Sequence, residues 1–313
     1  MNIELGEFYA RLGSIALIMA LGFILGKRKL IGKETNHQLV NLLLMVFMPA
    51  SLFSAFPAHY DAESLHLFLA GMVAGLVVML GLIIVSKLIF VKELFRGELR
   101  YEAQFAFIFN NATFLGYPIV ANTFGPSGII AYCGFIIAFN VALFSYGVYL
   151  FERKITPRLI TGILKNPNII AVALGMLVFL AGIQLPGFMT DAVSFVGGAT
   201  TPLSIICIGY MLSNANFRRT LKQWRLAVTA ILQLFLGPVM TYFLLTFLRF
   251  PDEVVSVCTL LQALPTATSL GLFATKYGGN EVESSELVTI STIFSIITMP
   301  LMVWMLLGWN LQF

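Results

Sequence analysis

The stretch that decides the fold is YEAQFAFIFNNATFLGYPIVA, residues 101–121, an apolar segment that contains a proline, Pro118. A helix that crosses a lipid bilayer needs about 20 mostly apolar residues, and this segment is long enough. Proline removes one backbone N–H and frees a carbonyl one turn earlier, and in lipid such groups need a partner. We therefore expect a transmembrane helix that is broken at Pro118, beside a polar cavity or a crossing helix. A packed kink is the alternative explanation for any single proline.

The whole chain has the composition of a membrane protein. Of its 313 residues, 58% are hydrophobic and 11% are charged, against about 25% charged residues in an ordinary soluble domain. This excludes a water-soluble enzyme, a nucleic-acid-binding protein and a disordered protein. The alternation of apolar and polar residues that marks a membrane barrel is absent, so the spans are helices. We expect an all-α integral membrane protein with ten transmembrane helices, at about 8–26, 36–56, 64–90, 101–121, 129–151, 167–185, 189–213, 224–248, 253–276 and 287–309.

The basic residues lie in alternate connections between these spans. Seventeen of them follow the first, third, fifth, seventh and ninth spans, whereas the other connections contain only Arg249. Loops rich in Lys and Arg stay in the cytoplasm. We therefore expect a multi-pass protein of the cell (plasma or inner) membrane with both termini outside the cytoplasm.

A second proline-containing span, EVVSVCTLLQALPTATSLGLFATK at residues 253–276, matches the first. Pro265 follows Pro118 by 147 residues, and Pro202 follows Pro49 by 153 residues. Two halves of five spans each must enter the membrane from opposite sides, because five is an odd number. We expect two inverted five-helix repeats, residues 1–151 and 167–313, joined by a cytoplasmic loop at 152–166. Their broken fourth and ninth helices would cross at mid-membrane.

The two proline breaks mark the expected ligand site. A half-helix that restarts at each proline would point backbone N–H groups and the positive end of its dipole into the cavity. This favours an anion, which amides and hydroxyls near the prolines would orient. Small and polar residues cluster there: Asn110, Asn111, Thr113, Gly116, Thr266, Thr268, Ser269 and Gly271.

Several chemical groups are missing from the spans. No acidic residue lies at the centre of any span, which argues against a proton pump and a carboxylate-built sodium site. Cys133, Cys207 and Cys258 lie inside apolar runs without metal-ligand spacing. No HExxH, GxSxG, GxGxxG or P-loop motif occurs. We expect neither enzyme activity nor a cofactor. Na⁺ and H⁺ are both candidates for a coupling ion.

Motifs of a known family run through nearly the whole chain. They are Pro49, Asn111-Ala-Thr-Phe-Leu-Gly116-Tyr-Pro118 with Phe124-Gly125, Asn166-Pro167-Asn168, Ala199-Thr200-Thr201-Pro202-Leu203-Ser204 with Gly209, Ala263-Leu264-Pro265-Thr266 with Tyr277-Gly278, and Ser291-Thr292 with Pro300. Singly these patterns are weak, but in this order and spacing they are specific. The chain resembles the auxin efflux carrier family of membrane transporters, including its bacterial members often labelled malate or malonate permeases.

The resemblance implies a fold like that of the sodium/bile-acid symporters. Spans 1, 2, 6 and 7 would form a scaffold, with a homodimer through these helices as one arrangement, and spans 3–5 and 8–10 would move against it like an elevator. The resemblance also implies that Asn111 contacts the substrate carboxylate and that Asn140 is a second polar contact. Thr266 and Thr268 differ from the plant carriers, and the short loop at 152–166 replaces their long one. Both departures weaken an assignment to auxin itself.

The leading hypothesis is a secondary transporter of a small organic anion, a carboxylate or dicarboxylate such as malate, malonate or an auxin-like acid. Its substrate site would comprise Asn111, Thr113, Asn140, Thr266 and Thr268, with Pro118 and Pro265 aiming the half-helix ends. Gln262 and Asn110, with carbonyls freed at the crossing, are candidates for binding a coupling ion. A membrane receptor or sensor that binds the anion without moving it, and an anion channel on the same fold, are the alternatives. The expected partners are the substrate and the lipid bilayer, with no nucleic acid.

Overall fold

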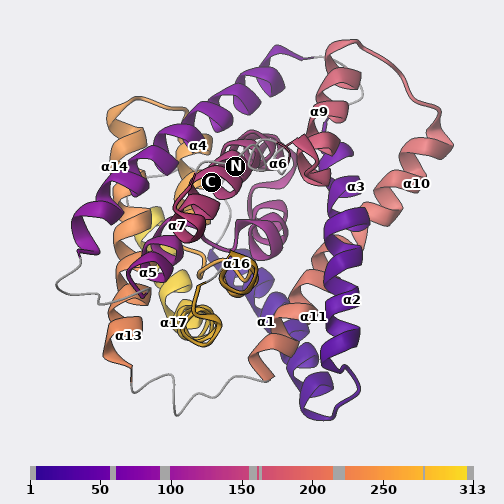
Figure 1. The fold of residues 1–313 in the computed structure, drawn as a ribbon. Helices are drawn as coiled ribbons and strands as arrows, with labels where there is room; N and C mark the ends of the chain where they lie inside the picture. Colours follow the sequence, from indigo (N-terminus) through magenta and orange to yellow (C-terminus); the bar gives the residue numbers. More distant parts are fainter. Residues whose placement is uncertain are drawn as a thin grey trace.

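The computed structural model describes residues 5–56, 61–91, 99–154, 161, 164–213, 223–277 and 279–308, and these residues are almost entirely helical (Figure 1). Six helical stretches within them are long and apolar enough to cross a membrane: Lys33–Phe53, Ala62–Ile89, Ala112–Glu152, Gly187–Ser213, Trp224–Phe247 and Val282–Met302. Two shorter apolar helices cover Ala16–Lys27 and Pro167–Leu180. The expectation of an all-helical, multi-pass membrane protein is confirmed.

The helices fall into two groups, which lie on opposite sides of Figure 1. One group, called here the scaffold helices, comprises α1 (Leu5–Lys27), α2 (Lys33–Leu42), α3 (Met48–Phe53), α9 (Pro167–Leu180), α10 (Gly187–Gly198) and α11 (Thr200–Ser213). The other, called the bundle helices, comprises α4 (Ala62–Ile89), α5 (Leu99–Ile108), α6 (Tyr117–Ala142), α7 (Val148–Glu152), α13 (Trp224–Ile231), α14 (Gly237–Phe247), α15 (Asp252–Gln262), α16 (Ser269–Tyr277) and α17 (Glu281–Gly308).

Glycines allow close packing within each group. A Cβ atom on Gly22 of α1 would clash with the backbone carbonyl of Ile206 on α11. In the bundle helices, a Cβ atom on Gly134 of α6 would clash with the carbonyl of Phe68 on α4. Lipid is as apolar as these side chains, so the hydrophobic effect does not drive membrane helices together. Close van der Waals packing between small residues does so instead. The backbones therefore touch along α1–α11 and along α4–α6.

In the described part of the chain, four π-helical segments interrupt the long helices: η1 (Leu43–Phe47), η2 (Ala112–Gly116), η3 (Leu143–Gly147) and η4 (Leu232–Leu236). Pro49, Pro118 and Pro238 are each the second residue of the helix that follows η1, η2 and η4. A π turn shifts the hydrogen-bond register by one residue. This shift accommodates the missing N–H and the ring of the proline without a break. The helix therefore continues through Pro118, and the break expected there lies elsewhere.

The break in this span lies at Phe109–Asn111, between α5 and η2. The matching break between α15 and α16 contains Pro265, as expected. The two breaks meet: Asn111 N donates to Pro265 O at 2.7 Å and Ala267 N donates to Phe109 O at 2.9 Å. These bonds enclose an isolated antiparallel bridge between Asn110 and Thr266. Backbone groups freed by one interruption are thus satisfied by the other.

A sharp turn divides α6 into two helices. Gly125 has φ 66° and ψ −152°, a conformation that residues with a Cβ atom rarely adopt. The residues before it belong to the interrupted span, and Pro126 begins the next.

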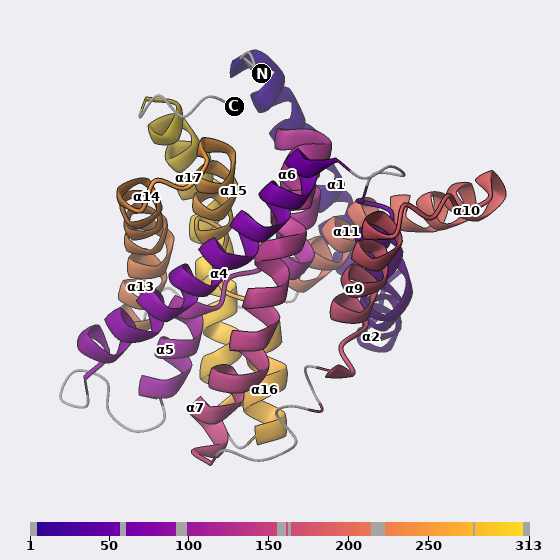
Figure 2. The same cartoon turned by 90° about the horizontal axis from the view of Figure 1, so that it is seen from above.

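At the scale of the molecule, the start of α1 and the end of α17 lie at one edge, and the ends of α7 and α16 lie at the other (Figure 2).

Candidate functional site

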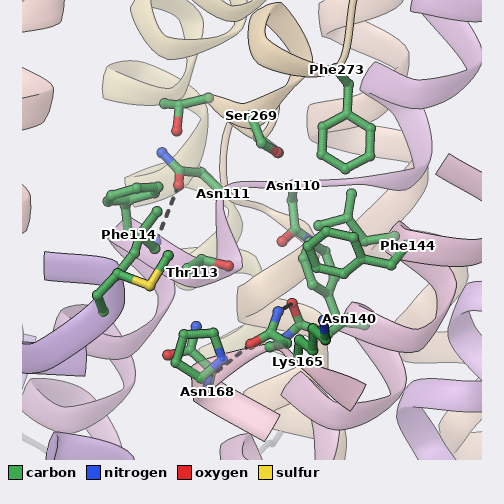
Figure 3. Close-up of a pocket in the computed structure, with 18 of the residues that line it drawn as sticks. Asn110, Asn111, Thr113, Phe114, Asn140, Phe144, Lys165, Asn168, Ser269 and Phe273 are labelled. Atoms are coloured by element: carbon green, nitrogen blue, oxygen red, sulfur yellow. Dashed lines mark hydrogen bonds between the residues drawn. The ribbon is translucent and has the colours of Figure 1, made fainter. Parts of the chain in front are cut away.

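A cavity of about 300 Å³ lies beside the crossing, between the scaffold and the bundle helices (Figure 3). It is lined by Leu44, Met45, Asn110, Asn111, Thr113, Phe114, Phe139, Asn140, Leu143, Phe144, Lys165, Asn166, Pro167, Asn168, Ala267, Thr268, Ser269, Phe273 and Tyr277. In Figure 3, Ser269 and Asn111 lie in the upper part of the cavity and Asn140, Lys165 and Asn168 in the lower part.

Two half-helices begin at this cavity. Thr113 and Phe114 belong to the first turn of η2, and Ser269 is the first residue of α16. Asn111 Oδ1 accepts a 3.3 Å hydrogen bond from Phe114 N and so caps η2. The first N–H groups of a helix have no partner within it and carry roughly half a positive charge. The cavity therefore faces two positive helix ends.

Asn110 presents an amide without a partner. Its side chain is 1% exposed, and neither its oxygen nor its nitrogen has a hydrogen-bond partner among the described residues. A buried polar group that stays unpaired costs on the order of 1–3 kcal/mol. The amide lines the cavity, so a bound ligand with donor and acceptor groups would relieve this cost.

A chain of amides links the two groups of helices at the lower end of the cavity. Asn140 on α6 donates to Ile136 O at 2.7 Å and accepts from Asn166 Nδ2 at 3.1 Å. Asn166 Oδ1 accepts from the backbone N–H groups of Asn168 and Ile169, at 2.9 and 3.3 Å. Asn166 is thus the N-cap of α9, directly followed by a proline at the first helical position.

The remaining walls of the cavity are apolar. They consist of Leu44, Met45, Phe114, Phe139, Leu143, Phe144, Pro167, Ala267 and Phe273, together with the ring of Tyr277. Three of the four π-helical segments, η1, η2 and η3, contribute to this lining. Lys165 is the one residue with an ionised side chain among the described lining residues, and no carboxylate is among them. The site thus combines a cation, helix N-termini and amides with an apolar body.

The structure brings five of the nine expected site residues to this cavity: Asn110, Asn111, Thr113, Asn140 and Thr268. Four others do not line it. Pro118 is the second residue of the helix after η2, and Pro265 and Thr266 form the crossing itself. Gln262 ends α15 with a buried side chain whose Nε2 has no partner in the described part of the chain.

Sequence reasoning missed several lining residues. Lys165 was counted only among the basic residues that follow the fifth span. Asn166 and Asn168 were noted only as part of a family motif. The Asn-Pro pair that begins α9 was the available signal, because it is typical of a capped helix start. Phe144 and Phe273 carried no signal, since apolar residues in a membrane span are unremarkable.

In the described residues, no three His, Cys, Asp or Glu side chains are placed to bind a metal ion.

Comparison with known proteins gives one family and several relatives. A family model described as membrane transport protein matches residues 8–303. A protein of Methanothermobacter thermautotrophicus named uncharacterized transporter is 23% identical over 304 residues, which cover 92% of this chain and 95% of that protein. The uncharacterized transporter MJ1031 of Methanocaldococcus jannaschii is 23% identical over 94% of this chain and 97% of its own. The uncharacterized transporter YfdV of Escherichia coli is 22% identical over 95% of this chain and 97% of its own.

Proposed function

Since this chain belongs to the membrane transport protein family, the auxin efflux carrier family that its motifs resemble, we propose that it is a secondary transporter of a small organic anion. One observation carries the proposal. A cavity at the meeting point of two interrupted helices is lined by Lys165, by amides and by two helix N-termini, with no carboxylate among its described lining residues. Such a site attracts an anion and repels a cation.

The shape and lining of the cavity support a small carboxylate. A volume of about 300 Å³ lies at the lower end of the range for small-molecule sites. Asn111 and Thr113 would hydrogen-bond the carboxylate beside the start of η2, with Thr268 on the facing half-helix. The phenylalanine walls favour an acid with an apolar body over a short dicarboxylate such as malate or malonate.

The helix contacts support two inverted repeats, residues 1–151 and 167–313, with the connection 152–166 on the cytoplasmic side. In the scaffold helices, α1 packs on α11 and α9 packs on α3. In the bundle helices, α4 packs on α6 and α13 packs on α17. Each pair is matched by another in which the two halves of the chain exchange places. This arrangement and the basic loops support the proposal of ten crossings with both termini extracytoplasmic.

An elevator motion would use the boundary at which the cavity lies. The amides and hydroxyls beside the crossing belong to the bundle helices, whereas Leu44, Met45 and Asn166 belong to the scaffold side. A shift of the bundle helices would carry the substrate past the scaffold, which could associate with a second copy through its outer helices. Gln262 and Asn110 remain the candidates for a coupling ion, which uptake with and without Na⁺ at two pH values would identify.

The test is uptake of labelled carboxylates by proteoliposomes that contain the wild type, Asn111→Ala or Asn122→Ala. Asn122 is the matched control because it lies on α6 outside the cavity and bonds Pro118 O. We expect uptake by the wild type and by Asn122→Ala, and a loss of about tenfold or more in Asn111→Ala. Equal uptake by all three would overturn the site.

The same vesicles separate the alternatives. Binding of the carboxylate without flux would indicate a receptor or sensor. An electrical conductance that moves more ions per second than a carrier cycle can would indicate an anion channel. Either result would overturn the proposal of a secondary transporter.

A further inference from the structure

Lys165 belongs to a different group of helices from the polar residues beside the crossing. Asn110, Asn111 and Thr113 belong to the interrupted span of the bundle helices. Lys165 directly precedes the N-cap of α9, a scaffold helix. α9 is anchored to the scaffold, because a Cβ atom on its Gly175 would approach the carbonyl of Phe53 on α3 to 3.1 Å.

Lys165 also lies at the open end of the cavity. Its side chain is exposed, and Figure 3 shows it beside Asn140, away from Ser269 and Asn111. No ion pair joins it to a carboxylate within the described ranges of the chain. A lysine ammonium is a mobile point charge with three donors, so it suits the first contact with an arriving anion.

A second cavity between the two groups of helices has another character. A space of about 500 Å³ lies between α1, α6, α11 and α17, again between scaffold and bundle helices. None of the described residues that line it is charged. Its hydroxyls on Thr292 and Ser295 donate to Val288 O and Thr292 O, at 2.6 and 2.8 Å. This cavity therefore offers an anion no counterpart of Lys165.

We propose that Lys165 captures the anion at one face of the membrane only and stays behind on the scaffold when the bundle helices carry the anion across. This inference rests on the proposed transport function and adds a difference between the two faces. At the face with Lys165, binding includes a charge-assisted contact. At the other face, the same amides hold the anion without that contact.

A thermodynamic constraint sharpens the inference. In a cycle driven by no ion gradient, the ratio of maximal rate to KM must be the same in both directions. A variant that weakens binding at one face must therefore shift the loaded carrier toward the other face by the same factor. The KM ratio and the ratio of maximal rates between the two directions must change together.

The experiment uses the full chain in phosphatidylcholine vesicles, sorted for one orientation through a tag on one terminus. The probe is a labelled carboxylate that the wild type transports, with KM and maximal rate measured from each face. The variants are Lys165→Gln, Lys165→Arg and the control Lys154→Gln, whose lysine is exposed at the end of α7 and lies outside the cavity.

We expect Lys165→Gln to raise KM at the Lys165 face by about tenfold and to leave KM at the other face unchanged. Raising the salt concentration should weaken binding by the wild type at the Lys165 face and have little effect on Lys165→Gln, because ions screen an exposed charge. Lys165→Arg and Lys154→Gln should behave as the wild type does.

Two results would overturn the inference. An equal rise of KM at both faces would mean that Lys165 travels with the substrate or supports the fold. An unchanged KM at both faces would mean that it does not contact the anion. If the wild type itself transports no carboxylate from either face, the proposed function fails instead, and this outcome is distinct from the other two.

Discussion

Asn111 combines two roles in a single side chain. Its oxygen caps η2 through Phe114 N, and its amide lines the cavity. The sequence pointed to this residue because it precedes a span proline by seven positions in a family motif. It did not reveal Asn166 or Lys165 as neighbours, since their approach to the cavity depends on the packing of α9 beside α6.

Asn111→Asp separates the two roles of this residue. The carboxylate has nearly the same shape, still accepts the bond from Phe114 N and suits a helix N-terminus. It also places a negative charge in an anion site. We expect normal thermal stability and at least a tenfold loss of carboxylate uptake. A loss of this size is what the removal of one hydrogen bond to a charged group produces. Asn122→Asp is the control, and wild-type uptake by Asn111→Asp would contradict the prediction.

Asp61 gives a pH dependence at the start of α4. Its carboxylate accepts the backbone N–H of Ser64 at 2.6 Å, and this hydrogen bond lowers the pKa of Asp61 below its ordinary value of 3.8. A lowered pKa means that the stabilisation is present above 3.8 and is lost as the pH falls through the folded-state pKa. Thermal unfolding in detergent from neutral pH downward should show this loss in the wild type.

Asp61→Asn provides the comparison, because asparagine caps a helix without titrating. The difference in unfolding midpoint between the wild type and Asp61→Asn should shrink as the pH falls below 3.8. A constant difference over the whole range would show that ionisation of Asp61 does not contribute to stability.

At the scale of the helices, the contact between α1 and α11 depends on Gly22. Its missing Cβ atom leaves room for the backbone of Ile206. Gly22→Ala must push the two helices apart, and we expect it to destabilise the protein by about 1–3 kcal/mol. The matched control is Gly13→Ala on the same helix, where an added Cβ atom has no neighbour within 4 Å.

Gly13→Ala should be neutral or slightly stabilising, because alanine favours a helix over glycine by about 1 kcal/mol. Thermal unfolding of the purified variants measures both effects. Similar losses in the two variants would mean that helix propensity or lipid contact, rather than the α1–α11 contact, determines their stability.

The location of the helix breaks shows where sequence reasoning ends. Hydropathy and the matched prolines identified the two interrupted spans. The position of the first break was wrong by about two turns, since η2 lets the helix pass through Pro118. A π turn depends on one extra residue in the register, which leaves no signature in composition or spacing. The second break contains Pro265 and was predictable for that reason.

At the scale of the whole molecule, the prediction that both termini lie outside the cytoplasm depends on where the few basic residues are placed. Reporters fused after residue 313 and within 152–166 would test it. Alkaline phosphatase, which is active only outside the cytoplasm, should be active at the terminus and inactive in the loop. A fluorescent protein that matures only in the cytoplasm should show the reverse. Any other pattern would contradict the predicted orientation.

The crossing joins main chain to main chain: Asn111 N to Pro265 O and Ala267 N to Phe109 O. Such bonds place few demands on side-chain identity. Mutations of side chains around the cavity can therefore leave these bonds in place, and the relatives named above share 22–23% of their residues with this chain. If the cavity binds the substrate as proposed, we expect its amides, its hydroxyls and Lys165 to be exchangeable for other ligands, because the junction beside them is held by backbone atoms.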